Sequence, residues 1–318
     1  MIITLIKASF NNLIIFFIVG KNIISVFLAR DKMIDKENFF KNFGKNAARE
    51  IDCTAPMNLK KLTNEIKVSL NNITDIYKLT LSEVSKGNRL PPYFEWIYDN
   101  YHIAAKEAKT ALTHLVNIKR LPAIAKGERK GFPAIFVLTK TYLRGNECLF
   151  EDKSITDFFL GAQEQRDFES SELWSLSIII RAALVSLLSD ICVDLKSFKN
   201  SDESNTVITR KIETIIKSLR TIATFEFDEL YKKISRVEKL LMSDPSGIFD
   251  LMSEKSKAYY RNRVCELSKK MGISEVSIVK EALSRAKQGK TEKEKHIGYY
   301  LLSDNLKGKK AYDRTRVQ

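Results

Sequence analysis

The sequence is short of the residues that bend or cross-link a chain. Its 318 residues include only 12 glycines, six prolines and four cysteines. Sheet proteins built on tight turns need more glycine and proline than this, so the composition favours long helices and an all-α fold. Apolar side chains make up 44% of the sequence and charged ones 29%. This balance excludes wholesale disorder and a protein with many membrane spans.

Cysteine and histidine are too few and too scattered to indicate a metal site or a disulfide framework. Cys53, Cys148, Cys192 and Cys265 lie far apart, each in an apolar stretch of expected helix. We interpret them as buried free thiols in a reducing compartment. The three histidines lack the spacing of a helical metal pair, and we find no phosphate-binding loop or nucleophile elbow. We therefore assign no catalytic residue, no metal ligand and no cofactor.

Residues 1–32 form a separate apolar segment. Their longest uncharged run, residues 8–20, has 13 residues, whereas a membrane-spanning helix needs about 20. The small residues that a signal-peptide cleavage site requires are poorly represented. Three interpretations stay open: a weak membrane anchor, a poor export signal, or an extension ahead of a native start at Met33.

Apolar periodicity predicts a multi-helix bundle made of two packed helical subdomains. We expect the first over residues 33–198 and the second over 206–288, joined by the polar linker 199–205 and followed by a basic, partly disordered tail over 289–318. We find no alternating strand pattern. The most apolar helix, 173–195, is either central in the bundle or membrane-spanning, and Arg181 within it favours the bundle. Arg181 should then pair with a carboxylate from another helix, and we expect Glu95 or Asp99.

Positive charge is concentrated near the carboxyl end of the chain. Residues 253–318 carry 17 Lys and Arg against eight Asp and Glu, a balance that suits nucleic acid or an anionic membrane surface. Within them, residues 266–282 have helix-turn-helix spacing, with Gly272 in the turn and Ser277 and Lys280 facing a DNA groove. Glu275 and Glu281 would repel phosphate. A basic nucleic-acid-binding protein is therefore our alternative interpretation.

A second polar cluster lies over residues 95–102. Glu95 and Asp99 are one helical turn apart, with Trp96, Asn100 and His102 between and beside them. Paired carboxylates at this spacing suit general acid–base chemistry. Core packing by the aromatic side chains and capping by the polar ones explain the same pattern better.

Four segments occur in a fixed order between Phe39 and Leu302. They are 95–103; 121–122 with 131–133; 172–181; and a composite of 235–238, 244–247, 259–261 and 296–301. Together they resemble the N-terminal region of the cyclic β-1,2-glucan synthases, which are large bacterial membrane glucosyltransferases. Two departures are evident: Ser177 stands where that family usually has proline, and Ser253-Glu254 replaces an acidic-aromatic pair.

The resemblance implies an accessory helical region of a UDP-glucose-dependent synthase at the cytoplasmic face of the bacterial inner membrane, or in the cytoplasm if residues 1–32 are not native. The family's transferase and phosphorylase-like domains do not fit into 318 residues, so we expect a detached or truncated region that is not catalytic alone and has those domains as partners. The structural or interaction candidates are Glu95, Trp96, Asp99, Asn100, His102, Glu172, Trp174, Arg181, Glu238, Asp244, Tyr260 and Arg261.

Overall fold

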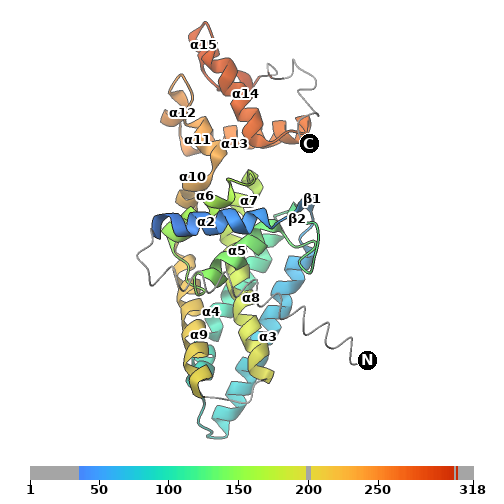
Figure 1. Ribbon diagram of the computed structural model, residues 1–318, viewed down its shortest axis with the longest axis vertical. Coiled ribbons are helices and arrows are strands. Elements are labelled where there is room, and N and C mark those ends of the chain that lie inside the picture. The colour runs from blue at the N-terminus through green and yellow to red at the C-terminus, as the bar shows by residue number, and fades with distance from the viewer. Residues whose placement is uncertain (1–35, 198–201, 304–305, 307–318) are drawn as a thin grey trace. The chain divides into compact units, whose positions relative to one another are not determined.

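The computed structural model describes residues 36–197, 202–303 and 306. The apolar segment 1–32 and most of residues 304–318 lie outside the described residues. The described chain is predominantly helical, and its one named sheet has two strands (Figure 1). The predicted all-α fold class is confirmed.

The described residues fall into two compact units, but the division differs from the expected one. Unit 1 comprises the chain up to Arg166 together with 176–225, and unit 2 comprises 167–175 together with the chain from Glu226. The helix α9 (Asp202–Ala223), expected in the second subdomain, belongs to unit 1. The helix α9 packs against α4 and α8, so the polar linker before it is not a boundary between the units. The buried apolar side chains of α9 include Ile212, Ile215, Ile216, Leu219 and Ile222.

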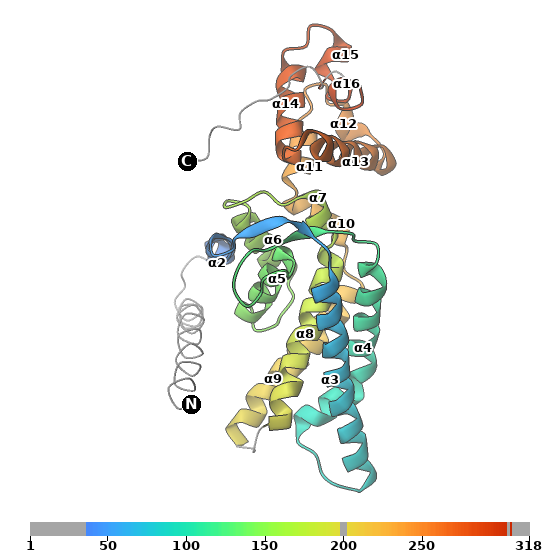
Figure 2. The ribbon, with the colours of Figure 1, turned by 90° about the vertical axis from the view of Figure 1, so that its right-hand side faces the viewer.

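Unit 1 is built around four long helices that run side by side (Figure 2). They are α3 (Lys60–Ser85), α4 (Pro92–Leu115), α8 (Leu176–Ser197) and α9. Three shorter helices complete the unit: α2 (Lys36–Arg49), α5 (Ala134–Gly145) and α6 (Asp152–Ala162). Two glycines let α2 and α6 approach closely: a Cβ on Gly44 would overlap the Phe158 carbonyl, and one on Gly161 would overlap the Lys41 carbonyl.

The helix α8 is the central element of unit 1. Among the described helices, its stretch Leu176–Lys196 is long and apolar enough to cross a membrane by length and composition. Within the protein, 67% of that stretch is buried, against α3, α4, α5 and α9. The sequence predicted this burial, because Arg181 within the apolar helix favoured a central position in the bundle over a membrane span. The expected start at residue 173 is wrong by a few residues, because α7 (Ser170–Trp174) is a separate turn in unit 2.

A small antiparallel sheet was not predicted. Strand β1 (Cys53–Met57) pairs with β2 (Leu121–Ile124), with Cys53 opposite Ile124. Cys53 is therefore an exposed strand residue, which corrects the prediction of a buried helical thiol. Cys148 and Cys192 are buried as expected, and Cys265 is half-buried; Cys148 lies in the loop after α5 with a positive φ of 65°.

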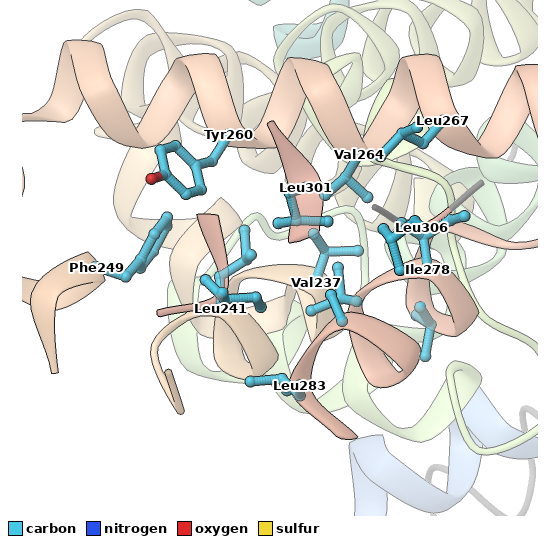
Figure 3. Close-up of a cluster of buried hydrophobic side chains, with 14 residues drawn as sticks. Val237, Leu241, Phe249, Tyr260, Val264, Leu267, Ile278, Leu283, Leu301 and Leu306 are labelled. Carbon is cyan, nitrogen blue, oxygen red and sulfur yellow. The ribbon is translucent and has the colours of Figure 1, made fainter. Parts of the chain in front are cut away.

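Unit 2 consists of short helices around one apolar core (Figure 3). After α7 come α10 (Phe227–Ile234), α11 (Arg236–Leu241), α12 (Ile248–Leu251), α13 (Glu254–Met271), α14 (Glu275–Lys287), α15 (Glu292–Lys295) and α16 (Gly298–Leu301). The helices α10 and α11 are separated at Ser235, whose hydroxyl caps α11 by accepting from the Glu238 N–H. The tail expected from residue 289 is folded through Ser303, because Ile297 and Leu301 are buried in this core.

Candidate functional site

A chain of hydrogen bonds in unit 2 joins three side chains that are far apart in the sequence. The His296 ring bonds through Nδ1 to Asp244 Oδ2 and through Nε2 to the Tyr260 hydroxyl, each at 2.8 Å. The other carboxylate oxygen of Asp244 accepts from the Ile297 N–H at 2.9 Å, and Ser246 donates its hydroxyl to Asp244 at 2.6 Å. Both ring nitrogens of His296 are thus held.

Local sequence explains how these groups meet. The segment 244–247 forms a turn in which Gly247 has a φ of 67°, and α12 starts directly after it. His296 follows α15, which is fixed by a capping box between Thr291 and Glu294. Gly298 then passes close to the cluster: a Cβ there would overlap the Tyr260 hydroxyl and lie 2.6 Å from His296 Nε2. The hydrogen bond between His296 and Tyr260 therefore requires glycine at position 298.

An open cavity of about 590 Å³ lies beside this chain of bonds. Tyr260 and His296 line it together with Tyr299, Lys293 and apolar side chains such as Ile248. The Lys293 ammonium lies 5.6 Å from the centre of the Tyr299 ring. Burial, and secondarily the Asp244 charge, raise the pKa of Tyr260 above its usual value, so at neutral pH its phenol is a hydrogen-bond donor rather than a phenolate nucleophile.

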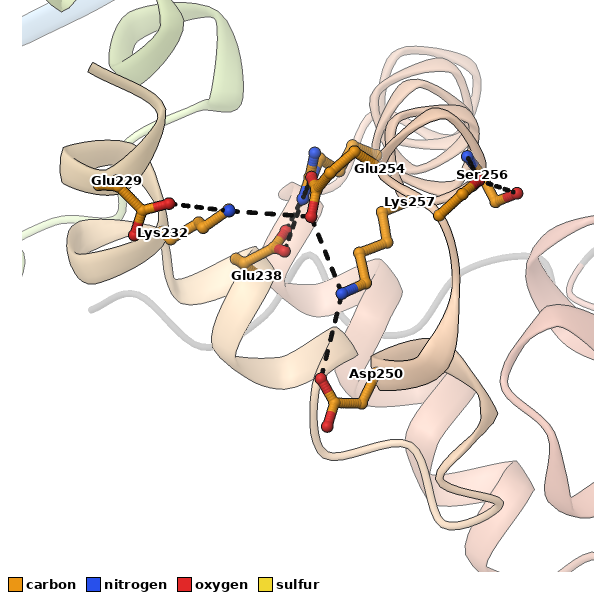
Figure 4. Close-up of polar contacts among 9 residues, drawn as sticks. Glu229, Lys232, Glu238, Asp250, Glu254, Ser256 and Lys257 are labelled. Carbon is orange, nitrogen blue, oxygen red and sulfur yellow. Dashed lines mark hydrogen bonds and ion pairs between the residues drawn. The ribbon is translucent and has the colours of Figure 1, made fainter. Parts of the chain in front are cut away.

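A buried ion pair adjoins the first cluster. Arg261 Nε and Nη2 donate to the two carboxylate oxygens of Glu238 at 2.6 and 2.7 Å. Figure 4 shows Glu238 near Glu254 and Lys257. Arg261 also contacts Glu254 at 3.4 Å, and Glu254 in turn lies 3.9 Å from Lys257. The hydrogen bond with Glu238 raises the pKa of Arg261. This two-point pairing holds α11 against α13 and leaves the guanidinium engaged within the protein.

Four of the predicted candidates, Glu238, Asp244, Tyr260 and Arg261, therefore meet in unit 2. Sequence reasoning did not select His296 as a candidate, although it began one of the segments that carry the resemblance. A single histidine shows no spacing signal, and its partners lie 36 and 52 residues away. The polar segment 244–247 was the sequence signal for such a contact, because Asp244 needs a hydrogen-bond partner when it is buried.

Glu172 and Trp174, which were expected at the start of the apolar helix, lie in α7 and have capping and packing roles in unit 2. Glu172 is fully buried, and its Oε2 accepts from the Glu169 N–H at 3.1 Å in a capping box that starts α7. Trp174 keeps 43% of its surface exposed and lies 5.9 Å from the Tyr231 ring, measured between ring centres.

The candidates on α4 do not converge on one site. Glu95, Asp99 and His102 are exposed, and Trp96 is half-buried. Asn100 is buried; its side-chain amide donates to the Trp96 carbonyl, and its oxygen accepts from Arg220 at 2.5 Å. The two carboxylates one turn apart thus lie on an exposed helix face.

Arg181 is paired, but the expected partner was wrong. Its Nε donates to Glu107 Oε2 at 2.7 Å, and its other nitrogens donate to the backbone carbonyls of Ser177 and Ile222. Glu95 and Asp99 lie on the exposed face of α4, whereas Glu107 lies on its buried face. The prediction of a carboxylate on a neighbouring helix is correct, and the error is in the register along α4.

Sequence reasoning missed a buried lysine in unit 1. Lys140 Nζ lies 2.7 Å from the Ser186 hydroxyl and 3.0 Å from Asp190, and Ser186 donates to Glu65 at 2.6 Å. Burial lowers the pKa of Lys140. A lysine beside a serine can activate a nucleophile, but Ser186 is fully buried. The group therefore ties α3, α5 and α8 together, and no periodic pattern marks an isolated lysine in an apolar helix for this role.

Two helices joined by a glycine turn are present over the predicted segment in unit 2. Gly272 ends α13 in the left-handed conformation with a φ of 69°, and Ser274 caps α14. Ser277 and Lys280 are exposed, as a DNA-reading face requires. Glu275 is buried and accepts from the Ser170 N–H at 2.9 Å, so it would not face phosphate as expected.

The comparisons with known proteins give a distant and partial relationship. No protein-family model matches the chain. The cyclic β-(1,2)-glucan synthase NdvB of Rhizobium meliloti (strain 1021) is 25% identical over 123 residues. The match covers 38% of this chain and 4% of that protein. This agrees with the resemblance read from the four segments. Across residues 36–197, 202–303 and 306, no group of three or more His, Cys, Asp or Glu side chains is placed to hold a metal ion.

Proposed function

We propose that this chain is an accessory helical region of a cyclic β-1,2-glucan synthase-like glucosyltransferase. It would serve as a scaffold or interaction module at the cytoplasmic face of the bacterial inner membrane and have no transferase activity alone. Its partners would be the transferase and phosphorylase-like domains of such a synthase. The partial match to the R. meliloti synthase supports the class of protein.

The observation that carries the non-catalytic role is that the polar groups of the candidate site are bonded to one another. The His296 ring nitrogens are taken by Asp244 and Tyr260, and the Arg261 guanidinium is taken by Glu238. A hydroxyl, an imidazole and a carboxylate bonded in series also occur in catalytic triads, but the hydroxyl of the Asp244–His296–Tyr260 chain is a phenol whose raised pKa keeps it protonated. Here the same residue types connect the segments 235–238, 244–247, 259–261 and 296–301, which suits a rigid interaction module.

A turnover assay with UDP-glucose tests this role. The purified full chain is incubated with UDP-glucose and Mg²⁺ or Mn²⁺, and UDP release is compared with a heat-killed control. We expect no release above that control, whereas a membrane preparation containing the R. meliloti synthase serves as the active reference. UDP release by the purified chain that is lost in the Tyr260→Phe variant would overturn the non-catalytic role.

A nucleic-acid-binding function is the second candidate, favoured by the exposure of Ser277 and Lys280 on α14. In that case binding should prefer particular duplex sequences, and the S277E/K280E variant should lose the preference. Salt weakens both specific and unspecific binding and so cannot decide. Our proposal predicts that duplex binding is weak, indifferent to sequence and little changed in S277E/K280E relative to a K269E/K270E control.

A further inference from the structure

A basic groove lies on unit 1, lined by residues from the start of α3, from the end of α4 and from the segment that follows α4. Its volume is about 460 Å³, and Lys60, Lys67 and Lys119 line it without any Asp or Glu among the lining residues. Lys60 and Lys67 are two turns apart on α3, roughly 10 Å along one helix face. Within the part of the chain that the structure describes, none of the three forms an ion pair. The groove is therefore a site of uncompensated positive charge.

The N-terminus of α3 adds positive charge to the groove, whereas the C-terminus of α4 carries partial negative charge. The helix α3 begins at Lys60 and has no acidic residue in its first turn. A helix N-terminus carries partial positive charge, so a lysine there opposes the stability of the helix instead of supporting it. The adjacent Lys61 is used internally, since it donates to the Lys130 carbonyl at 2.7 Å. Lys60 has no such internal role, and an anion outside the protein would stabilise it.

Besides the lysines, aliphatic and small polar side chains line the groove: Leu59, Thr63, Asn64, Leu115, Val116 and Ile118. Leu59 and Leu115 are buried, whereas Val116 keeps 81% of its surface exposed. Nucleic-acid sites of comparable charge often add aromatic rings for base stacking, and no aromatic side chain is among the lining residues of this groove. An exposed aliphatic side chain beside lysines instead fits the boundary between lipid headgroups and acyl chains, where lysine stems lie along apolar surface and ammonium groups reach phosphate.

We infer that this groove docks on an anionic phospholipid surface, with Lys60, Lys67 and Lys119 on the headgroup phosphates and Val116 at the acyl boundary. The inference deepens the proposed function, because it rests on the membrane placement proposed there and assigns it to a surface of unit 1. It also assigns membrane contact to this groove rather than to the apolar segment 1–32 or the basic residues after 303.

Lysine acylation mapped by mass spectrometry tests the inference on the full chain. Vesicles of phosphatidylglycerol should protect Lys60, Lys67 and Lys119 from the reagent, and vesicles of phosphatidylcholine should not. Lys255, Lys269 and Lys270, which are exposed in unit 2, are the internal control and should stay reactive. Unchanged reactivity of the three groove lysines with both vesicles would overturn the inference. Equal protection by duplex DNA would overturn the assignment to lipid.

A matched pair of variants measures the contribution of the groove. Replacing Lys60, Lys67 and Lys119 by Gln should weaken partition onto phosphatidylglycerol vesicles roughly 100-fold, as expected for three lysines near an anionic surface. The same replacement at Lys255, Lys269 and Lys270 should change partition less than threefold. Equal losses in the two variants would show an unspecific charge effect and contradict the inference. Neither result bears on UDP-glucose turnover, so the two proposals fail separately.

Discussion

At the scale of single residues, buried ion pairs connect helices in both units. Arg181 and Glu107 keep only 13% and 4% of their side chains exposed, and Arg261 and Glu238 keep 10% and 5%. Removing two such charges from water costs nearly as much as their attraction returns. Removing one charge of such a pair lowers the stability of the protein much more, because the remaining charge stays buried without a partner.

Replacing Arg181 by Ala should therefore destabilise unit 1 by about 3–5 kcal/mol, because Glu107 is left buried and unpaired. The two tryptophans, Trp96 and Trp174, lie one in each unit, so fluorescence of a W174F background during urea unfolding reports on unit 1.

The double variant R181M/E107L is the control for Arg181. It removes both charges and should recover most of the lost stability. A midpoint for R181A within error of the parent protein would show that Arg181 is not held in a buried pair.

The four thiols should differ sharply in reactivity. Burial raises the pKa of Cys148 to about 11, and of Cys192 and Cys265 to about 12, so little thiolate forms at pH 8. Cys53 is exposed. A native chain should release one equivalent of thionitrobenzoate quickly from Ellman's reagent, a denatured chain four, and the C53S variant none quickly. Two or more fast equivalents from the native chain would contradict this burial.

At the scale of elements, α16 begins at Gly298, although glycine has a low helix propensity. A Cβ at 298 would collide with the Tyr260 hydroxyl and the His296 ring. Gly298→Ala should therefore destabilise unit 2 by about 1–3 kcal/mol, the usual cost of overpacking. Trp174 fluorescence in a W96F background measures this during urea unfolding.

The same substitution in a Tyr260→Phe background isolates the contact. Without the hydroxyl, Gly298→Ala should cost clearly less than in the parent chain, and the difference is the coupling energy of a double-mutant cycle. Additive effects of the two changes would mean that Gly298 is required for another reason.

The helices were predictable where their apolar face is regular. The periodicity of α3, α4 and α14 marks them, and Gly272 with Ser274 marks the turn before α14. Strand β1 was not predictable, since all five of its residues are exposed and one is a proline. The break at Ser235 has neither glycine nor proline; it rests on a serine cap that periodicity does not reveal.

The candidate site was less predictable than the helices. Glu238, Asp244, Tyr260 and Arg261 were selected through the family resemblance, but neither the Glu238–Arg261 pairing nor the role of His296 between Asp244 and Tyr260 was predicted. Local spacing says nothing about which side chains meet across 23–52 residues. The partner of Arg181, Glu107, lies about two turns beyond Asp99 and three turns beyond Glu95 on α4. The reason is the same, since only packing in three dimensions decides which turn of α4 faces α8.

At the scale of the whole molecule, the chain combines a long-helix bundle and a second unit of short helices with a net charge of +14. The bundle carries the basic groove, and the second unit carries the bonded polar network and the helix–turn–helix. Positive charge on a protein at an anionic surface raises its local concentration there. This distribution suits a module that holds a membrane enzyme in place better than one that performs the chemistry.

The most direct test of the proposed role is glucan synthesis by the membrane complex that this proposal predicts for the chain. A tagged chain is purified from detergent-solubilised membranes, and its eluate is supplied with labelled UDP-glucose beside an equal amount of chain purified alone. The account predicts labelled β-1,2-glucan from the membrane eluate and none from the chain alone. An inactive eluate, or glucan made by the chain alone, would contradict it.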